Sequence, residues 1–166
     1  MDTKIYMYLF IELLIVSLID YRTKKISNLW SILHLILTLV VYFLLPEVYP
    51  FTWSVFFIPV VFFVVGFVLF LMKIMGGGDA KYLATFFLLI PHSMQRNSLE
   101  ILLIVTTVIG FYVLLYRIVK NLNQFIMAIR LQDMKLFRGI WGSKFAFSPV
   151  ILISWIWIGV QYKILI

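Results

Sequence analysis

The chain has 166 residues, of which 64% are hydrophobic and 13% are charged, and its mean hydropathy is +1.08. Soluble domains are about half apolar and about a quarter charged, and a chain of this length buries only about two-thirds of its surface. The composition therefore excludes a soluble enzyme, a disordered tail and a secreted disulfide scaffold. The apolar residues form continuous runs, unlike the alternating pattern of an outer-membrane barrel. We predict an all-α, polytopic membrane protein with a single domain over residues 1–166.

Six apolar runs are candidates for membrane-spanning helices, which need about 17 to 25 residues. The fourth run is too short to cross unless it extends into its flanks. The first run ends in an aspartate rather than in a small-residue cleavage site, so we interpret it as a retained span and not as a signal peptide. The six runs lie near residues 5–19, 29–45, 51–72, 80–91, 99–116 and 145–161.

The positive charges predict the orientation of the chain. If all six runs cross the membrane, eleven of the fourteen Lys and Arg side chains lie on one side, and Lys4, Arg96 and Lys163 lie on the other. Cytoplasmic connections collect Lys and Arg, so we expect the termini outside and a multi-pass protein of the cell (inner) membrane. The net charge of +7 then suits anionic lipid headgroups, and we predict no nucleic-acid partner.

The last predicted cytoplasmic connection, residues 117–144, is long for a loop. Within it Leu122, Phe125, Ile126 and Ile129 follow helical spacing among polar residues. This pattern is typical of an amphipathic helix that lies in the membrane interface. A cytoplasmic continuation of the fifth helix is the alternative.

Two aspartates need a special account, because an ionisable side chain in or beside a spanning helix is costly. Asp20 ends the first run, and Asp79 precedes the fourth. The predicted orientation places both at cytoplasmic helix ends. Two carboxylates at one membrane depth can form an acid/base pair, in which one holds a proton while the other deprotonates water. Such a pair could hydrolyse a peptide bond; alternatively, each aspartate only marks the lipid–water boundary beside a Lys or Arg.

Three consecutive glycines, Gly76, Gly77 and Gly78, directly precede Asp79. Each costs about 1 kcal/mol of helix propensity, and glycine is favoured where the backbone takes unusual dihedrals or approaches another chain closely. We therefore expect a loop that leaves room for an extended substrate beside Asp79. A flexible turn between two helices is the alternative.

Together the two aspartate segments resemble the signature of the type IV prepilin peptidases, membrane aspartyl proteases of the Gly-x-Gly-Asp class. In the first segment, Asp20 is followed by basic residues within 22–25 and by Ile26-Ser27-Asn28, where the family usually has Ile-Pro-Asn. The second segment, Gly76-Gly77-Gly78-Asp79-Ala80-Lys81, matches Gly-x-Gly-Asp-x-Lys. The resemblance covers the chain from the first helix to the fourth, and the six runs agree with the family's six-span core.

The resemblance implies an aspartic endopeptidase in which Asp20 and Asp79 are the catalytic pair. Residues 76–78, Lys81 and Asn28 would shape the loop or the substrate site. The implied substrate is a prepilin or pilin-like precursor with a hydrophobic helix, cut at the cytoplasmic face. Because the chain has no cysteine, it resembles the short peptidase-only members, those of tight-adherence (Flp-type) pilus systems or archaeal preflagellin and prepilin peptidases, without methyltransferase activity.

Glu12 is a further candidate, since it lies eight residues before Asp20 and projects from roughly the same helix face. It could line a hydrated cavity near the aspartates. Alternatively, it hydrogen-bonds to a neighbouring helix through Ser17, Ser31, His34 or Thr38. The sequence offers no cluster of His and carboxylate residues with metal-ligand spacing, so we expect no metal and no other cofactor.

Two other classes of function fit the acidic residues. A small transporter or proton-relay subunit would use Glu12, Asp20 and Asp79 as relay groups, and a non-cleaving scaffold for pilus assembly would use none of them chemically. A relay predicts acids at staggered depths, whereas a protease predicts two acids together at one face. The helical positions favour the protease.

Overall fold

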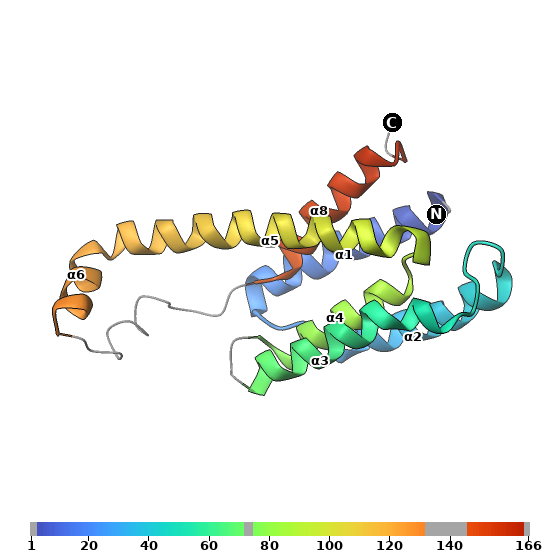
Figure 1. The fold of residues 1–166 in the computed structure, drawn as a ribbon, viewed down its shortest axis with the longest axis horizontal. Coiled ribbons are helices and arrows are strands. Elements are labelled where there is room, and N and C mark those ends of the chain that lie inside the picture. The colour runs from blue at the N-terminus through green and yellow to red at the C-terminus, as the bar shows by residue number, and fades with distance from the viewer. Residues whose placement is uncertain (1–2, 72–74, 132–145, 165–166) are drawn as a thin grey trace.

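The computed structural model describes residues 3–71, 75–131 and 146–164, and these residues contain helices and no strand. This confirms the all-α prediction for the described part of the chain (Figure 1). The elements are α1 (Thr3–Thr23), α2 (Asn28–Leu44), the 3-10 helix η1 (Trp53–Phe56), α3 (Phe57–Leu71), α4 (Gly77–Leu88), α5 (His92–Lys120), α6 (Leu122–Leu131) and α8 (Ser148–Gln161).

Two helical segments are long and apolar enough to cross a membrane. The first is Trp53–Leu71, which comprises η1 and α3, and the second is α5. In the most apolar 18-residue stretch of each helix, only 17% and 22% of it, respectively, is buried. A core helix of a soluble protein would be mostly buried, whereas these helices expose large apolar side chains such as Phe63, Phe67 and Phe111. α2 and α8 are apolar but shorter. Six membrane crossings with the termini outside stay a prediction.

The first helix ends later than the sequence predicted. α1 continues to Thr23, so Asp20 lies in its last turn rather than at its end. The helix stops where Lys24 takes a left-handed backbone conformation (φ 54°) and its N–H donates to the Asp20 carbonyl oxygen at 2.8 Å. This single bond is the usual left-handed termination of a helix. The Thr23 hydroxyl also donates to the Ile19 carbonyl oxygen at 2.9 Å.

The fourth helix begins earlier than predicted. α4 starts at Gly77, so two of the three glycines form its first turn instead of a loop. The helix ends at Leu88, and Pro91, which follows closely, is the N-cap residue of α5. At 12 residues α4 remains short.

α5 and α6 are separate helices. α5 continues beyond the predicted span to Lys120 and ends at Asn121, whose side-chain amide donates to the Arg117 carbonyl oxygen at 3.0 Å. α6 then turns away from the α5 axis, at the far end from the rest of the bundle (Figure 1). Its Ile126 and Met127 side chains are more than half exposed. A direct continuation of the fifth helix is thus wrong for these residues, while membrane binding by α6 stays a prediction and residues 132–145 lie outside the described chain.

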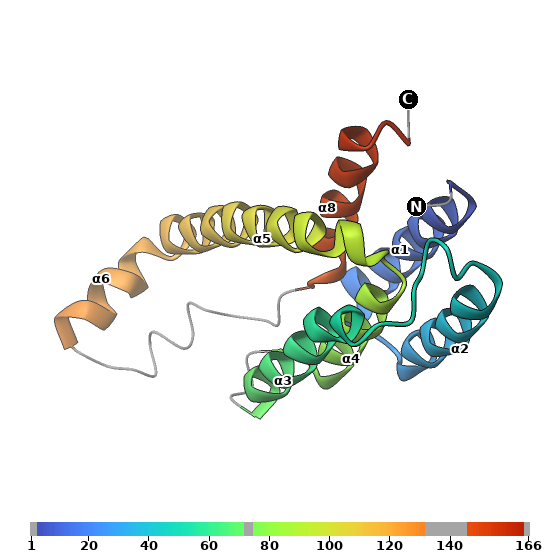
Figure 2. The same ribbon diagram turned by 45° about the vertical axis from the view of Figure 1, so that its right-hand side comes forward.

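The helices pack in pairs: α1 against α8, α3 against α4, α2 against α4, and α5 against α8. α3 and α4 approach especially closely where Gly66 faces Ala80, because a side chain at Gly66 would meet the Ala80 Cβ. One end of the bundle holds the end of α1 and the beginnings of α2, α4 and α8 (Figures 1 and 2). The opposite end holds the beginnings of α1 and α5 and the end of α8.

Candidate active site

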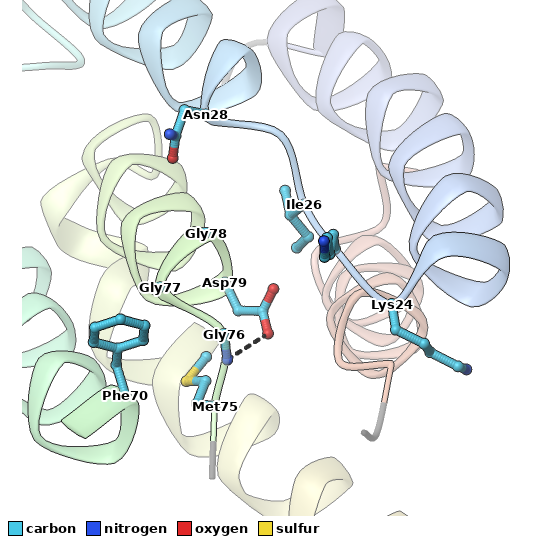
Figure 3. A pocket seen from close by; sticks show the side chains of 10 residues that line it. Lys24, Ile26, Asn28, Phe70, Met75, Gly76, Gly77, Gly78 and Asp79 are labelled. Carbon is cyan, nitrogen blue, oxygen red and sulfur yellow. Dashed lines mark hydrogen bonds between the residues drawn. The ribbon is translucent and has the colours of Figure 1, made fainter. Parts of the chain in front are cut away.

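Asp79 is the third residue of α4, and its carboxylate faces back over the start of the helix. Its Oδ2 accepts a hydrogen bond from the Gly76 backbone N–H at 3.2 Å (Figure 3). This bond satisfies a backbone donor at the helix N-terminus, where the helix dipole also favours a negative charge. The local sequence therefore fixes the Asp79 side chain to its own helix. The carboxylate lies at the N-terminal end of α4, and Asp79 is about nine-tenths buried.

Gly78 is the glycine that the packing requires most strictly. A Cβ at this position would collide with the backbone carbonyl oxygen of Ile26, whereas a Cβ at Gly77 would meet only the Phe70 ring, at 3.3 Å. None of the three glycines has a left-handed backbone conformation, so dihedral freedom does not explain why glycine is needed here. Gly78 is explained instead by close approach of two backbones.

A cavity of about 440 Å³ opens beside Asp79. Its walls come from the α1–α2 connection, the end of α3 and the start of α4 (Figure 3). The wall is mixed, with amine and amide groups as well as apolar surface, which suits a peptide better than a purely apolar ligand. The lining residues are Lys24, Lys25, Ile26, Asn28, Phe70, Met75, Gly76, Gly77, Gly78 and Asp79.

Asp20 is surrounded quite differently. Its Oδ2 accepts two hydrogen bonds from Ser148, from the backbone N–H at 3.1 Å and from the side-chain hydroxyl at 2.8 Å. Ser148 is the first residue of α8, so Asp20 also satisfies an N-terminal donor of a helix, but one that is 128 residues away in sequence. Asp20 is 2% exposed and Ser148 is fully buried.

The two aspartates belong to one end of the bundle. Asp20 lies in the last turn of α1 and Asp79 in the first turn of α4, and these two helix ends lie at the same end (Figures 1 and 2). The chain that leaves Asp20 reaches Ile26 and packs there against Gly78. Asp20 itself is not among the residues that line the cavity. The fold thus brings the two aspartate segments into backbone contact, and Asp79 but not Asp20 lines the cavity.

The sequence model of the type IV leader peptidase family matches residues 7–162, a range that includes both aspartate segments. The chain belongs to the type IV leader peptidase family. Members of this family are aspartic-type peptidases and membrane proteins. No curated protein and no solved structure matches the chain.

The other residues singled out in the sequence take different places. Asn28, the first residue of α2, lines the cavity with the three glycines. Lys81 is exposed and does not line the cavity. Glu12 does not line it either; its carboxylate is buried and hydrogen-bonded to His34 on α2, which was the alternative interpretation. The described residues contain no group of three His, Cys, Asp or Glu side chains that could hold a metal ion.

Ser148 is a site residue that the sequence analysis missed. The sequence signal for it is the pair Ser148-Pro149, since serine and proline are both favoured at helix starts. That signal predicts the start of a helix. It does not predict that the hydroxyl and the N–H turn toward Asp20, because this depends on how α8 packs against α1.

Proposed function

We propose that this protein is an endopeptidase that removes the leader from prepilin or pilin-like precursors at the cytoplasmic membrane face, using Asp20 and Asp79. The observation that carries the proposal is the backbone contact between Ile26 and Gly78, which joins the two aspartate segments at the end of the bundle that holds the cavity. Membership in the type IV leader peptidase family supports the peptidase chemistry.

The reaction needs one ionised and one protonated carboxyl group. The ionised aspartate takes a proton from water while the oxygen of that water bonds to the carbonyl carbon of the scissile peptide. The protonated aspartate gives its proton to the carbonyl oxygen. In the resulting tetrahedral diol the C–N bond breaks: the aspartate that took the proton from water gives it to the nitrogen, and the other aspartate takes back a proton from a diol hydroxyl. A carboxylic acid and an amine leave, and both carboxyl groups are back in their starting states. The two carboxyl groups must therefore reach the same water, within several Å of each other.

The charge distribution supports the cytoplasmic face. Lys24 and Lys25 line the cavity, and Arg117 and Lys120 end α5, which extends past the same end of the bundle (Figure 1). Lys4, near the start of α1, lies at the opposite end. Positive side chains concentrate on the cytoplasmic side of membrane proteins.

The residues of the cavity wall are consistent with a substrate in which the cleavage site lies between a polar leader and an apolar helix. Phe70 and Met75 offer apolar contacts, while Asn28 and the two lysines offer polar contacts. Phe70 is also half exposed at the end of the apolar helix α3. A hydrophobic substrate helix lying beside α3 would have its polar end at Asp79.

The test is cleavage of a candidate prepilin by the purified protein in detergent or liposomes, with the products identified by mass spectrometry. Wild type should give one cut between the leader and the hydrophobic helix. Asp20→Ala and Asp79→Ala should give none. Glu47→Gln is the matched acid control, because Glu47 is exposed and lies in the connection between α2 and η1, and it should cleave like wild type. A wild type that leaves prepilins intact, or aspartate variants that still cut, would overturn the proposal.

A further inference from the structure

Four polar side chains form a buried cluster inside the apolar bundle, apart from the two aspartates. His34 Nε2 lies 2.7 Å from Glu12 Oε1 and 2.9 Å from Glu12 Oε2. The Tyr82 hydroxyl donates to Glu12 Oε1 at 3.3 Å, and Thr85 Oγ1 lies 3.2 Å from His34 Nδ1. We call Glu12, His34, Tyr82 and Thr85 the Glu12–His34 cluster.

The Glu12–His34 cluster is buried, and Glu12 also interacts with the partly exposed Tyr8, one turn earlier on α1. The cluster members are between 0% and 9% exposed. The His34 ring packs against the Tyr82 and Phe86 rings of α4, with centroids 4.9 and 5.9 Å away. Polar groups buried this deeply are costly unless they are hydrogen-bonded, and here each cluster member has a partner in the cluster. The removal of Glu12 would take this partner from His34 Nε2 and from the Tyr82 hydroxyl, and a buried polar group without a partner is costly. Thr85 also donates to the backbone oxygens of Lys81 and Tyr82.

The cluster joins the helices that carry the two aspartates. Glu12 lies on α1, eight residues before Asp20, and Tyr82 lies on α4, three residues after Asp79. At about 1.5 Å per residue, these spacings correspond to about 12 Å and about 4.5 Å along the helix axes. α1 packs mainly against α8, and α4 against α2 and α3. The Tyr82–Glu12 hydrogen bond is thus a direct polar connection between two helices whose main packing partners differ.

We propose that the Glu12–His34 cluster fixes the position of α1 relative to α4 and thereby sets the separation of Asp20 and Asp79. Its members are positioning residues, since they act through the helices and do not touch the substrate. The proposal rests on the proposed function for its catalytic consequence, but its structural consequence, a fixed α1–α4 distance, does not depend on what the protein cleaves. His34 completes the cluster by tying α2 to both other helices.

The first test measures the distance between the helices. Because the chain has no cysteine, spin labels can be placed at two introduced cysteines, at Leu18 on α1 and Lys81 on α4, which are both exposed. Double electron–electron resonance should give a narrow distance distribution for the otherwise wild-type protein. Tyr82→Phe and Glu12→Gln should broaden or shift it. An unchanged distribution in both variants would overturn the proposal.

The second test measures kcat and KM for prepilin cleavage without the labels. Tyr82→Phe removes one buried hydroxyl and should lower kcat about tenfold or more with KM unchanged, since small misplacements of reacting groups have large rate effects. Tyr6→Phe is the matched control: the Tyr6 hydroxyl is equally buried on α1 but donates to the Trp155 carbonyl oxygen of α8 at 2.9 Å. It should lower thermal stability by a similar amount and leave kcat within about twofold.

The outcomes separate the two proposals. If wild type cleaves no prepilin but Tyr82→Phe changes the α1–α4 distance, the proposed function fails and the role of the cluster stands. If wild type cleaves and Tyr82→Phe behaves like Tyr6→Phe in both kcat and distance, the proposed function stands and the role of the cluster fails. A loss of kcat at an unchanged distance would also refute positioning through the helices.

Discussion

The two aspartates occupy opposite kinds of surroundings within one end of the bundle. Asp20 lies inside a helix, is nearly fully buried, and accepts two hydrogen bonds from Ser148 on another helix. Asp79 lies at the start of its helix, lines a cavity, and accepts a hydrogen bond from Gly76, the residue just before that helix. Ser148, distant in sequence, therefore holds Asp20, whereas a bond within the Gly76–Asp79 motif orients Asp79.

This difference indicates how the site would respond to a substrate. The Asp20 carboxylate is positioned by α1 and α8 before any substrate arrives. The Asp79 side is shaped by close backbone packing at Gly78 and by the cavity wall. We infer that α1 and α8 supply a fixed carboxylate, and that the glycine turn before Asp79 supplies the surface along which the substrate backbone lies. Changes on the two sides should then have different kinetic signatures.

Apart from changes of the two aspartates themselves, the largest effect is expected on the Asp79 side, for Gly78→Ala. The new Cβ would meet the Ile26 carbonyl oxygen, which belongs to the backbone and has little freedom to move. We expect the start of α4 to shift from the α1–α2 connection and cleavage to fall about a hundredfold, with an effect on both KM and kcat. Steady-state kinetics on a prepilin would measure this.

Gly77→Ala is the neighbouring control for Gly78→Ala. Its Cβ would meet the Phe70 ring, a side chain that can adjust. The activity of Gly77→Ala should exceed that of Gly78→Ala by at least about tenfold. Equal losses in the two variants would mean that the glycines matter for a reason other than the contact with Ile26.

A smaller effect with a different signature is expected on the Asp20 side, for Ser148→Ala. This change removes the shorter of the two hydrogen bonds to Oδ2 and keeps the backbone N–H bond. A hydrogen bond to a charged group contributes about 1.5–3 kcal/mol, so we expect kcat to fall about tenfold or more with KM unchanged. Ser148→Thr keeps the hydroxyl and should recover most of kcat. If Ser148→Ala is as active as wild type, the hydroxyl does not position Asp20.

The smallest effect is expected for Lys81→Gln. Lys81 follows Asp79 closely in sequence but is exposed and outside the cavity wall. Exposed substitutions of this kind usually change free energies by no more than about 0.5 kcal/mol, so cleavage in detergent should stay within about twofold of wild type. A larger loss in detergent would assign Lys81 a role in the site that its position in the fold does not explain.

Local patterns in the sequence were enough to predict much of the fold. The continuous apolar runs place α2 within one residue at each end, at Asn28–Leu44 against a predicted 29–45. The ends of α1 and α4 were less predictable, because they depend on the backbone conformation of Lys24 and on glycines that are compatible with a first helical turn. For both helices the hydropathy pattern predicts the apolar run. The helix itself extends beyond that run, at the end of α1 and at the start of α4.

The sequence motifs point to candidate residues of the site, but most of their contacts across the chain could not be predicted from sequence. Gly76, Gly78 and Asp79 form one short motif, and the bond between Gly76 and Asp79 is local, whereas the contact of Gly78 with Ile26 is not. The bond from Ser148 to Asp20 crosses 128 residues and depends on how α8 packs against α1. For Glu12, four side chains were possible partners, and the choice of His34 required the rotation of α2 relative to α1. The sequence does not set that rotation by itself.

The most direct measurement of the central claim is single-turnover cleavage of a prepilin by wild type, Asp20→Asn, Asp79→Asn and the double variant. Two carboxyl groups that act on one water work as a unit, so the losses should not multiply. We predict that each single variant falls to the rate without enzyme and that the double variant is no slower. Cleavage by either single variant within about tenfold of wild type would contradict the account, because a lone carboxylate cannot supply both proton transfers at such a rate.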